Sequence, residues 1–296
     1  MILPYKNNSN NPCQNLHSIG KVVFAAAGPG DPDLITVKAA NSLQMADVVL
    51  TDRLVSDVIL HRYVSASAEI VYVGKECSKL LSTAQKRIND LMVHYALQGK
   101  NVVRLKGGDV SVFSNILDEL ETLIAHQIPY EIIPGVSSAL GAAAYAGIPL
   151  TARGYATAVR FLTLYKPENI SQNEWKEFAS TSDTLVLYMS LANLGAIVEK
   201  FIENEISSDV HIAIAEQATT CYQNIYTCNI YDFNKELSRE NFISPSLVII
   251  GKVVALHQRF KWLQNSGHQK AYFLPVENGL QINNETTKPK KYVIGR

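Results

Sequence analysis

The sequence has few cysteines and no long apolar run, and both shortages restrict what the protein can be. Its four cysteines form no C-x-x-C pair and have no histidine cluster near them, so we expect no metal site and no disulfide framework. Its longest apolar runs, such as 22–27 and 185–189, are far shorter than the ~20 residues that span a membrane. The first residues also lack the basic and apolar regions of a secretory signal. We therefore expect a cytoplasmic protein with no membrane partner.

An excess of one charge is also missing, because 27 basic residues balance 27 acidic ones. Nucleic-acid-binding proteins usually carry a basic excess, so we expect no nucleic-acid partner. Hydrophobic residues make up 47% of the 296 residues, which is too much for a disordered chain. The length then suggests one large domain or two smaller ones.

Short β-branched segments alternate with longer amphipathic stretches in the first half of the chain. The pattern predicts strands at 22–27, 48–51, 69–73, 102–105 and 130–133, and helices at about 33–46, 54–61, 83–97 and 111–126. Strands that alternate with helices indicate parallel pairing and an α/β fold.

The second half keeps part of this alternation. It predicts strands at 161–163, 184–188, 211–214, 224–228 and 246–250, and helices at 139–146, 194–202 and 231–237. The segment 225–230 lies close to its neighbours in sequence, so we expect some antiparallel pairing in this half.

Composition also suggests where the domains begin and end. Residues 1–18 are rich in asparagine and aperiodic, which is typical of a disordered arm. A Pro-Gly pair at 134–135 interrupts the chain and marks a boundary between domains at 19–135 and 136–262. The polar residues 263–296 are expected to form a solvated tail.

Three loops after predicted strands carry residues suited to a ligand site. Gly28-Pro29-Gly30-Asp31-Pro32 permits close approach of a ligand to the backbone, and the following helix start favours anions. Asp52-Arg53 and Gly107-Gly108-Asp109 follow two other strands. In a parallel sheet such loops share one edge, where ligands bind. Ordinary tight turns and helix caps remain alternatives for each loop alone, and neither the Rossmann nor the Walker glycine pattern is matched.

A fourth segment continues this series beyond the Pro-Gly pair. Ser137-Ser138 stand at a helix start, where hydroxyls can bind a ligand or cap the helix. Arg153 follows a strand-like stretch, where it could bind a carboxylate or form a surface salt bridge.

In this order and spacing, the segments resemble the tetrapyrrole methylases, and within them the uroporphyrinogen-III C-methyltransferases that use S-adenosylmethionine. The resemblance covers about residues 20–262. The matching stretches are GPGDPDLITVKAANSLQMADVV, DRLVSDVIL, VVRLKGGD, IPYEIIPGVSSALGAAAYAGIPLTARGYA, TLVLYMSL and SPSLVIIGKVVAL. The resemblance implies two α/β domains of the tetrapyrrole methylase type with the cofactor in a cleft between them, and a homodimer.

The implied activity is S-adenosylmethionine-dependent C-methylation of uroporphyrinogen III. Two successive methylations would give precorrin-2, on the route to sirohaem and cobalamin. A methylase of the same fold with another acceptor remains an alternative, as does a non-catalytic paralogue that binds S-adenosylmethionine or a tetrapyrrole. A nucleotide-dependent oxidoreductase has only the strand–loop–helix alternation in its favour.

The resemblance also assigns roles to residues of this chain. Asp52 matches the proton acceptor, and Lys75 matches the proton donor. The residues that would hold substrate are Arg53, Asp118 and Arg153. Those that would line the cofactor site are Pro29, Gly107, Gly108, Asp109, Val112, Ser137, Ser138, Met189 and Ala218. The substrate's many carboxylates need a cationic rim, for which the candidates are Arg53, Lys75, Lys106, Arg153 and Arg160.

The chain departs from the family pattern on the substrate side. Where relatives read G-G-D-P-F-x-F-G-R-G-G-E-E, it reads GGDVSVFSNILDE, so Asn115 replaces an arginine and Ile116-Leu117 replace two glycines. Leu164-Tyr165 stand where relatives have Gly-His. The cofactor motifs are mostly kept, so the sequence supports methyl transfer more strongly than it supports a particular acceptor.

Overall fold

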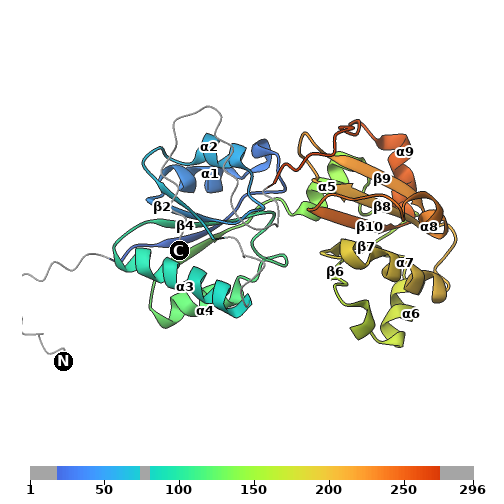
Figure 1. Cartoon of the computed structure of the whole chain (residues 1–296), viewed down its shortest axis with the longest axis horizontal. Helices are drawn as coiled ribbons and strands as arrows, with labels where there is room; N and C mark the ends of the chain where they lie inside the picture. Colours follow the sequence, from blue (N-terminus) through green and yellow to red (C-terminus); the bar gives the residue numbers. More distant parts are fainter. Residues whose placement is uncertain (1–18, 74–80, 274–296) are drawn as a thin grey trace, which may run out of the picture.

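Two five-stranded sheets, each covered by helices on both faces, make up the described part of the chain (Figure 1). The computed structural model describes residues 19–73 and 81–273. This two-domain α/β architecture confirms the predicted fold class. No helix among these residues is long and apolar enough to cross a membrane.

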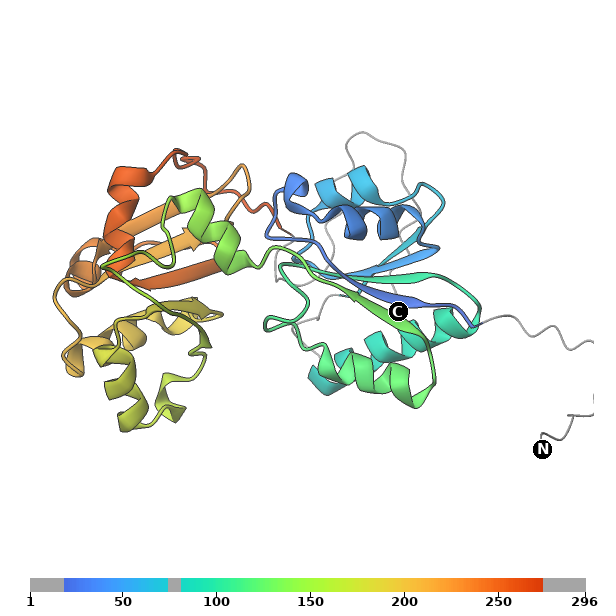
Figure 2. The ribbon, with the colours of Figure 1, turned by 180° about the vertical axis from the view of Figure 1, so that it is seen from behind.

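The first sheet is entirely parallel, as predicted, with the strand order β3-β2-β4-β1-β5. Helices α1 and α2 cover one face, and α3 and α4 cover the other (Figures 1 and 2). The strands are β1 (Val22–Ala26), β2 (Val48–Thr51), β3 (Glu69–Tyr72), β4 (Val102–Lys106) and β5 (Tyr130–Ile133). The helices are α1 (Val37–Gln44), α2 (Asp57–Tyr63), α3 (Leu81–Leu97) and α4 (Leu117–Ala125).

The second sheet is mixed, with the order β6-β7-β10-β8-β9. Only β6 and β7 are parallel, and the antiparallel pairing of β8 with β9 confirms the expectation for this half. The strands are β6 (Val159–Thr163), β7 (Thr184–Tyr188), β8 (His211–Glu216), β9 (Asn224–Asn229) and β10 (Ser246–Gly251). The helices are α5 (Ser138–Ala146), α6 (Gln172–Ser180), α7 (Leu194–Glu203), α8 (Phe233–Glu236) and α9 (His257–Phe260).

Two expected helices begin later than the sequence pattern suggests, and local hydrogen bonds explain why. The stretch 33–46 contains a short 3₁₀ turn, Pro32–Leu34, which Asp31 caps, before Thr36 caps α1 through the amide of Ala39. The stretch 111–126 is helical only from Leu117. Residues 110–116 form a loop instead, because Phe113 and Asn115 adopt left-handed backbone conformations that a helix cannot contain.

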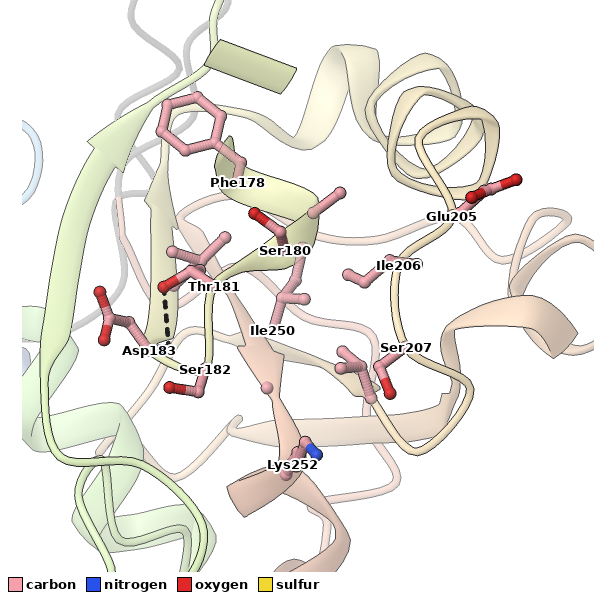
Figure 3. A pocket seen from close by; sticks show the side chains of 14 residues that line it. Phe178, Ser180, Thr181, Ser182, Asp183, Glu205, Ile206, Ser207, Ile250 and Lys252 are labelled. Carbon is pink, nitrogen blue, oxygen red and sulfur yellow. Dashed lines mark hydrogen bonds between the residues drawn. The ribbon is translucent and has the colours of Figure 1, made fainter. Parts of the chain in front are cut away.

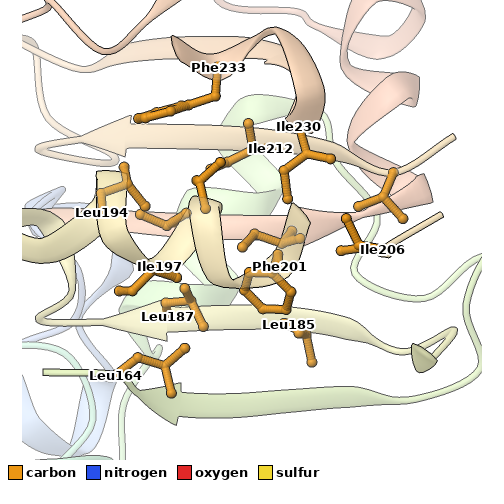
Figure 4. Packing of buried hydrophobic residues seen from close by; sticks show 14 of the residues in the cluster. Leu164, Leu185, Leu187, Leu194, Ile197, Phe201, Ile206, Ile212, Ile230 and Phe233 are labelled. Atoms are coloured by element: carbon orange, nitrogen blue, oxygen red, sulfur yellow. The ribbon is translucent and has the colours of Figure 1, made fainter. Parts of the chain in front are cut away.

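The core of the second domain packs aromatic side chains of α6 and α7 against the sheet. Trp175 lies edge-on to Phe201, with ring centroids 5.5 Å apart. Phe201 is fully buried among aliphatic side chains of β7, β8 and the segment before α8 (Figure 4). This apolar cluster fixes the sheet from which the loops after β7 and β8 emerge.

The chain continues beyond α9 as an irregular segment that runs back toward the first domain (Figure 1). We expected a solvated tail from about residue 263. Up to Phe273, however, this segment makes repeated hydrogen bonds to the second domain, and Phe273 itself is buried.

Replacing Phe201 with alanine should lower the free energy of unfolding by about 3–5 kcal/mol, because it opens a cavity beside Trp175. Chemical denaturation measures this loss. The matched control is Met45→Ala at the exposed end of α1, which should change stability by less than about 0.5 kcal/mol. Equal losses for the two variants would contradict the packing described.

Candidate active site

The glycine loops after β1 and β4 are bonded directly to each other. The Gly28 amide donates to the Gly108 carbonyl at 3.1 Å, and the Gly108 amide donates back to the Gly28 carbonyl at 2.7 Å. β1 and β4 are parallel neighbours in the sheet, and just beyond their ends this pair forms an isolated antiparallel bridge between the two loops. The structure therefore brings two of the predicted ligand loops together at the carboxyl edge of the first sheet.

Close packing explains why glycine stands at several of these positions. A Cβ atom on Gly107 would lie 2.7 Å from the carbonyl oxygen of Leu54, in the loop that begins with Asp52. One on Gly135 would lie 2.5 Å from the Cβ of Ala26. Gly108 has φ +69°, and a Cβ there would lie 3.1 Å from the hydroxyl of Ser138. The Asp52 loop, the 107–109 loop and the start of α5 thus meet at one place.

Asp109 binds the surrounding loops with its own carboxylate. One oxygen accepts from the amide and hydroxyl of Ser111, at 2.8 and 2.5 Å, and the other accepts from the Gly135 amide at 2.8 Å. Burial alone would raise the pKa of this carboxyl, but these hydrogen bonds outweigh it and leave the pKa below its ordinary value. Asp109 therefore joins the loop after β4 to the connection between the domains.

Asp52, the predicted proton acceptor, has one oxygen fixed and one side open. Its Oδ1 accepts from the Leu54 amide at 3.0 Å, and its Oδ2 lies 3.8 Å from the Arg104 guanidinium. About a quarter of the side chain, 26%, remains exposed. Lys75, the predicted proton donor, lies outside the described residues.

Beneath Asp52 lies a buried charge cluster that sequence reasoning missed, formed by Arg104, Lys106 and Glu119. The Glu119 carboxylate accepts from Arg104 Nε at 3.2 Å and from Lys106 Nζ at 2.8 Å. Burial lowers the pKa of Lys106, and the Arg104 charge lowers it further, while Glu119 opposes both effects. The sequence did contain an indication of this cluster. Arg104 and Lys106 are two apart on a strand and so share a face, and the acidic Glu119 follows on the next helix.

This cluster corrects the expected cationic rim. Lys106 is buried and paired with Glu119, and Arg160 pairs with Asp183 and Glu177. Arg53 and Arg153 form no salt bridge with another described residue. Within the described residues, those two arginines are therefore the rim candidates that remain for binding substrate carboxylates, while Lys75 lies outside them.

Asn115, which stands where relatives have arginine, is exposed but bonds to a buried residue of α3. Its backbone is left-handed, with φ +55°, and its side-chain amide donates to Gln85 of α3 at 3.2 Å. Gln85 in turn donates to Glu119 at 3.4 Å. Asp118 is exposed, and its carbonyl oxygen accepts from the side chains of Asn89 and Thr122.

In the second domain, Tyr188 at the end of β7 contacts the predicted residue Ser137, the start of α5, and the loop that contains Val112. Its hydroxyl lies 2.7 Å from that of Ser137 and accepts from the Ala139 amide at 3.2 Å, so Tyr188 caps α5 in place of the serine. Its ring packs on Phe113, with centroids 4.9 Å apart, from the loop that also contains Val112. Burial raises the pKa of Tyr188.

The remaining predicted cofactor residues lie on strained or closely packed backbone. Met189 follows Tyr188 with φ +53° and an exposed side chain. Ala218 lies between Gln217 and Thr219, which are both left-handed. Pro29 packs against α5, where a Cβ on Gly141 would lie 2.7 Å from its ring. Strained backbone of this kind is concentrated at functional sites.

The two domains touch through these same loops. The Asp31 amide donates to the Thr219 hydroxyl at 3.0 Å, and the Tyr145 hydroxyl donates to the Asp31 carboxylate at 2.6 Å. This contact raises the pKa of Tyr145 to about 12, through burial first and the nearby carboxylate second. The Pro29 loop and the Ala218 loop therefore lie side by side at the domain junction.

A separate cavity of about 450 Å³ opens on the second domain (Figure 3). Its lining comes from the end of α6, the start of β7 and the end of β10, with hydroxyls such as Ser180, Thr181 and Ser207. It lies at the opposite end of β7 from Met189, and none of the described candidate residues lines it. Among the described residues, no group of three or more histidine, cysteine or acidic side chains could hold a metal ion.

Comparison with known proteins places these loops in a family. A model of the tetrapyrrole (corrin/porphyrin) methylases matches residues 21–234. The uroporphyrinogen-III C-methyltransferase of Bacillus subtilis is 42% identical over 248 residues, which cover 83% of this chain and 96% of that protein. A siroheme synthase of Pseudomonas fluorescens is also 42% identical, but the chain spans only 53% of its length.

Solved structures agree with this assignment. A uroporphyrin-III C-methyltransferase from Thermus thermophilus has a TM-score of 0.67 and 32% identity, covering 80% of this chain and 100% of that one. The same methyltransferase has also been solved in complex with S-adenosylhomocysteine. A cobalt precorrin-4 methyltransferase has a TM-score of 0.70 and 27% identity, over 80% of this chain and 97% of that one.

Replacing Asp109 with asparagine should lower the free energy of unfolding by about 1–3 kcal/mol at neutral pH, because an amide nitrogen cannot accept one of these hydrogen bonds. The lowered pKa of Asp109 gives stability that is present above pH 3.8 and lost as the pH falls below it. The difference in the free energy of unfolding between the wild type and Asp109→Asn should therefore become smaller as the pH falls below 3.8. Denaturation at several pH values tests this, with Asp118→Asn as the exposed control.

Replacing Glu119 with glutamine should destabilise the protein by about 3–5 kcal/mol, because Arg104 and Lys106 lose the carboxylate that neutralises them inside the domain. Glu121→Gln, on the exposed side of the same helix, is the matched control and should cost little. Thermal and chemical denaturation both measure the difference. A variant as stable as the control would contradict the buried charge cluster.

Proposed function

The chain belongs to the tetrapyrrole methylase family, and on that premise we propose that it transfers methyl groups from S-adenosylmethionine to carbon atoms of uroporphyrinogen III. Two successive transfers would give precorrin-2, which leads to sirohaem and cobalamin. The observation that carries the proposal is the 42% identity to the Bacillus C-methyltransferase over 96% of that protein's length. The siroheme synthases support the same pathway, although the chain spans about half of their length.

The loops at the domain junction fit S-adenosylmethionine. Gly108 is left-handed and Ala218 lies between two left-handed residues, and backbone of this kind is concentrated at functional sites. Met189, in the TLVLYMSL stretch, has an exposed side chain. We propose that the cofactor is held by the residues assigned above, namely Pro29, Gly107, Gly108, Asp109, Val112, Ser137, Ser138, Met189 and Ala218. When bound, it supplies a methyl group already activated by its sulfonium centre.

The role of the protein is then to orient the acceptor and to remove a proton. After a ring carbon is methylated, a proton must leave a neighbouring carbon, and a carboxylate within reach can accept it. Asp52 suits this role because the Leu54 amide and Arg104 hold it while part of it stays exposed. Lys75 remains the proposed proton donor.

Arg53 and Arg153 are proposed to bind the carboxylates of the substrate. Both lack a salt-bridge partner among the described residues, and guanidinium groups bind carboxylates in a bidentate manner. Asp118 lies exposed at the start of α4, on the same side of the molecule as the loop after β4. Its role in holding substrate remains a prediction of the family pattern.

A methylase with another tetrapyrrole acceptor is the second candidate, and one observation favours it. Asn115 is neutral and donates to Gln85, and Lys106 is paired with Glu119, so this rim presents fewer free cations than the family motif implies. A structurally similar protein, the cobalt precorrin-4 methyltransferase, is named for a tetrapyrrole other than uroporphyrinogen III.

We also propose that the protein acts as a cytoplasmic homodimer without a nucleic-acid or membrane partner. The family resemblance supports the dimer. The balanced charge of the sequence supports the absence of a nucleic-acid partner.

Purified protein incubated with labelled S-adenosylmethionine and uroporphyrinogen III should yield a doubly methylated product, detected by mass and absorbance. Asp52→Asn should lower turnover by about 10²–10⁴-fold, because it removes the proton acceptor but leaves the cofactor loops intact. Its affinity for S-adenosylhomocysteine should stay close to that of the wild type.

Asp57→Asn is the matched control, because this carboxylate lies in the first turn of α2 and accepts from the Tyr72 hydroxyl at 2.9 Å. Its turnover should remain near the wild-type rate. Methylation of a different ring with none of uroporphyrinogen III would favour the second candidate. No methyl transfer to any tetrapyrrole would overturn both.

A further inference from the structure

Residues 264–273, here called the strap, lie along the edge of the second sheet. Asn265 accepts from the Ile225 amide at 2.8 Å and donates to the Ile225 carbonyl at 3.0 Å, so it pairs with β9 as a neighbouring strand would. Asn224 donates to the carbonyl of His268 at 3.2 Å. Since β9 is the last strand of its sheet, the strap satisfies backbone groups that the sheet leaves unpaired.

The middle of the strap holds Gln217, the residue before Ala218. Gln217 Nε2 donates to the Lys270 carbonyl at 2.8 Å, and Gln217 Oε1 accepts from the Tyr272 amide at 2.6 Å. Gln217 is fully buried and left-handed, with φ +44°. A buried amide without these partners would be costly, so the strap stabilises the strained conformation of the Ala218 loop.

The end of the strap reaches the first domain. Phe273 is buried against Gly30 of the GPGDP loop, where an added Cβ would lie 3.2 Å from its ring. That Cβ would also lie 3.3 Å from the carbonyl oxygen of Ala218. Tyr272 interacts with Ser56, which caps α2. One short segment therefore contacts both loops that are assigned to the cofactor and that belong to different domains.

We propose that Gln217, Tyr272 and Phe273 are positioning residues that set the affinity of the cofactor site. This inference rests on the proposed function. The family match ends at residue 234, so the strap lies outside the part of the chain that the family model describes. The strap fixes the Ala218 loop through its hydrogen bonds to Gln217, and Phe273 packs against Gly30. If the cofactor binds both loops, its affinity depends on whether the strap is bound to them.

Calorimetry with S-adenosylhomocysteine tests the coupling. Phe273→Ala should weaken binding by roughly fivefold to a hundredfold, the range usual for coupled sites, while Phe273→Leu should keep most of the wild-type affinity. Phe260→Ala is the matched control, because this aromatic residue lies just before the strap and is about half exposed, at 48%. It should bind like the wild type.

Hydrogen exchange on the wild-type protein gives a second test that needs no variant. Because coupling is reciprocal, S-adenosylhomocysteine should slow exchange of the Tyr272 amide, which donates to Gln217. Unchanged exchange at Tyr272 on binding would overturn the inference, as would a folded Phe273→Ala protein with wild-type affinity. A wild-type protein that binds no S-adenosylhomocysteine would instead overturn the proposed function, and the inference with it.

Discussion

The first domain depends on the ion pairs of the buried Glu119 carboxylate, because they allow two cations to be buried inside the protein. Arg104 and Lys106 belong to β4, which lies between β1 and β2 in the sheet. Both face the layer covered by α3 and α4, where an unpaired charge would be costly. With Glu119 in place, β4 can run to the carboxyl edge with Asp52 beside Arg104 and the 107–109 loop directly after Lys106. The proposed proton acceptor thus lies next to an arginine that Glu119 holds in place.

The second constraint is that loops from two separate sheets must meet without a shared strand. Short polar contacts join them, because the Asp31 amide donates to Thr219 and the Tyr145 hydroxyl donates to the Asp31 carboxylate, while Asp109 accepts from the Gly135 amide in the connection between the domains. Such hydrogen bonds fix orientation while burying little apolar surface. The junction therefore has defined geometry and holds the Pro29 loop beside the Ala218 loop, as a ligand site between domains requires.

Sequence periodicity predicted the class and strand positions because buried strands and helices bear distinct repeats. It failed where a residue's bonding partner is distant in sequence, or where a local hydrogen bond competes with helix formation. The stretch 111–116 has a helical pattern, but the Ser111 amide donates to Asp109 and the backbone of Asn115 is left-handed. Lys106 was expected at the rim because spacing alone does not show that Glu119 neutralises it. The tail from 263 looked polar, yet its polar groups are the ones that pair with β9 and Gln217.

The altered rim and the buried cluster are parts of one polar chain. Asn115 donates to Gln85, Gln85 donates to Glu119, and Glu119 holds the Arg104 that faces Asp52. An arginine at position 115 would have to leave the left-handed conformation that asparagine tolerates well, or bear its strain, and would break the link to Gln85. The substitution seen in this chain is therefore not a simple loss of one substrate contact. It replaces a charge by a hydrogen bond to Gln85, and it leaves Arg53 and Arg153 as the residues that we propose for recognition of the acceptor.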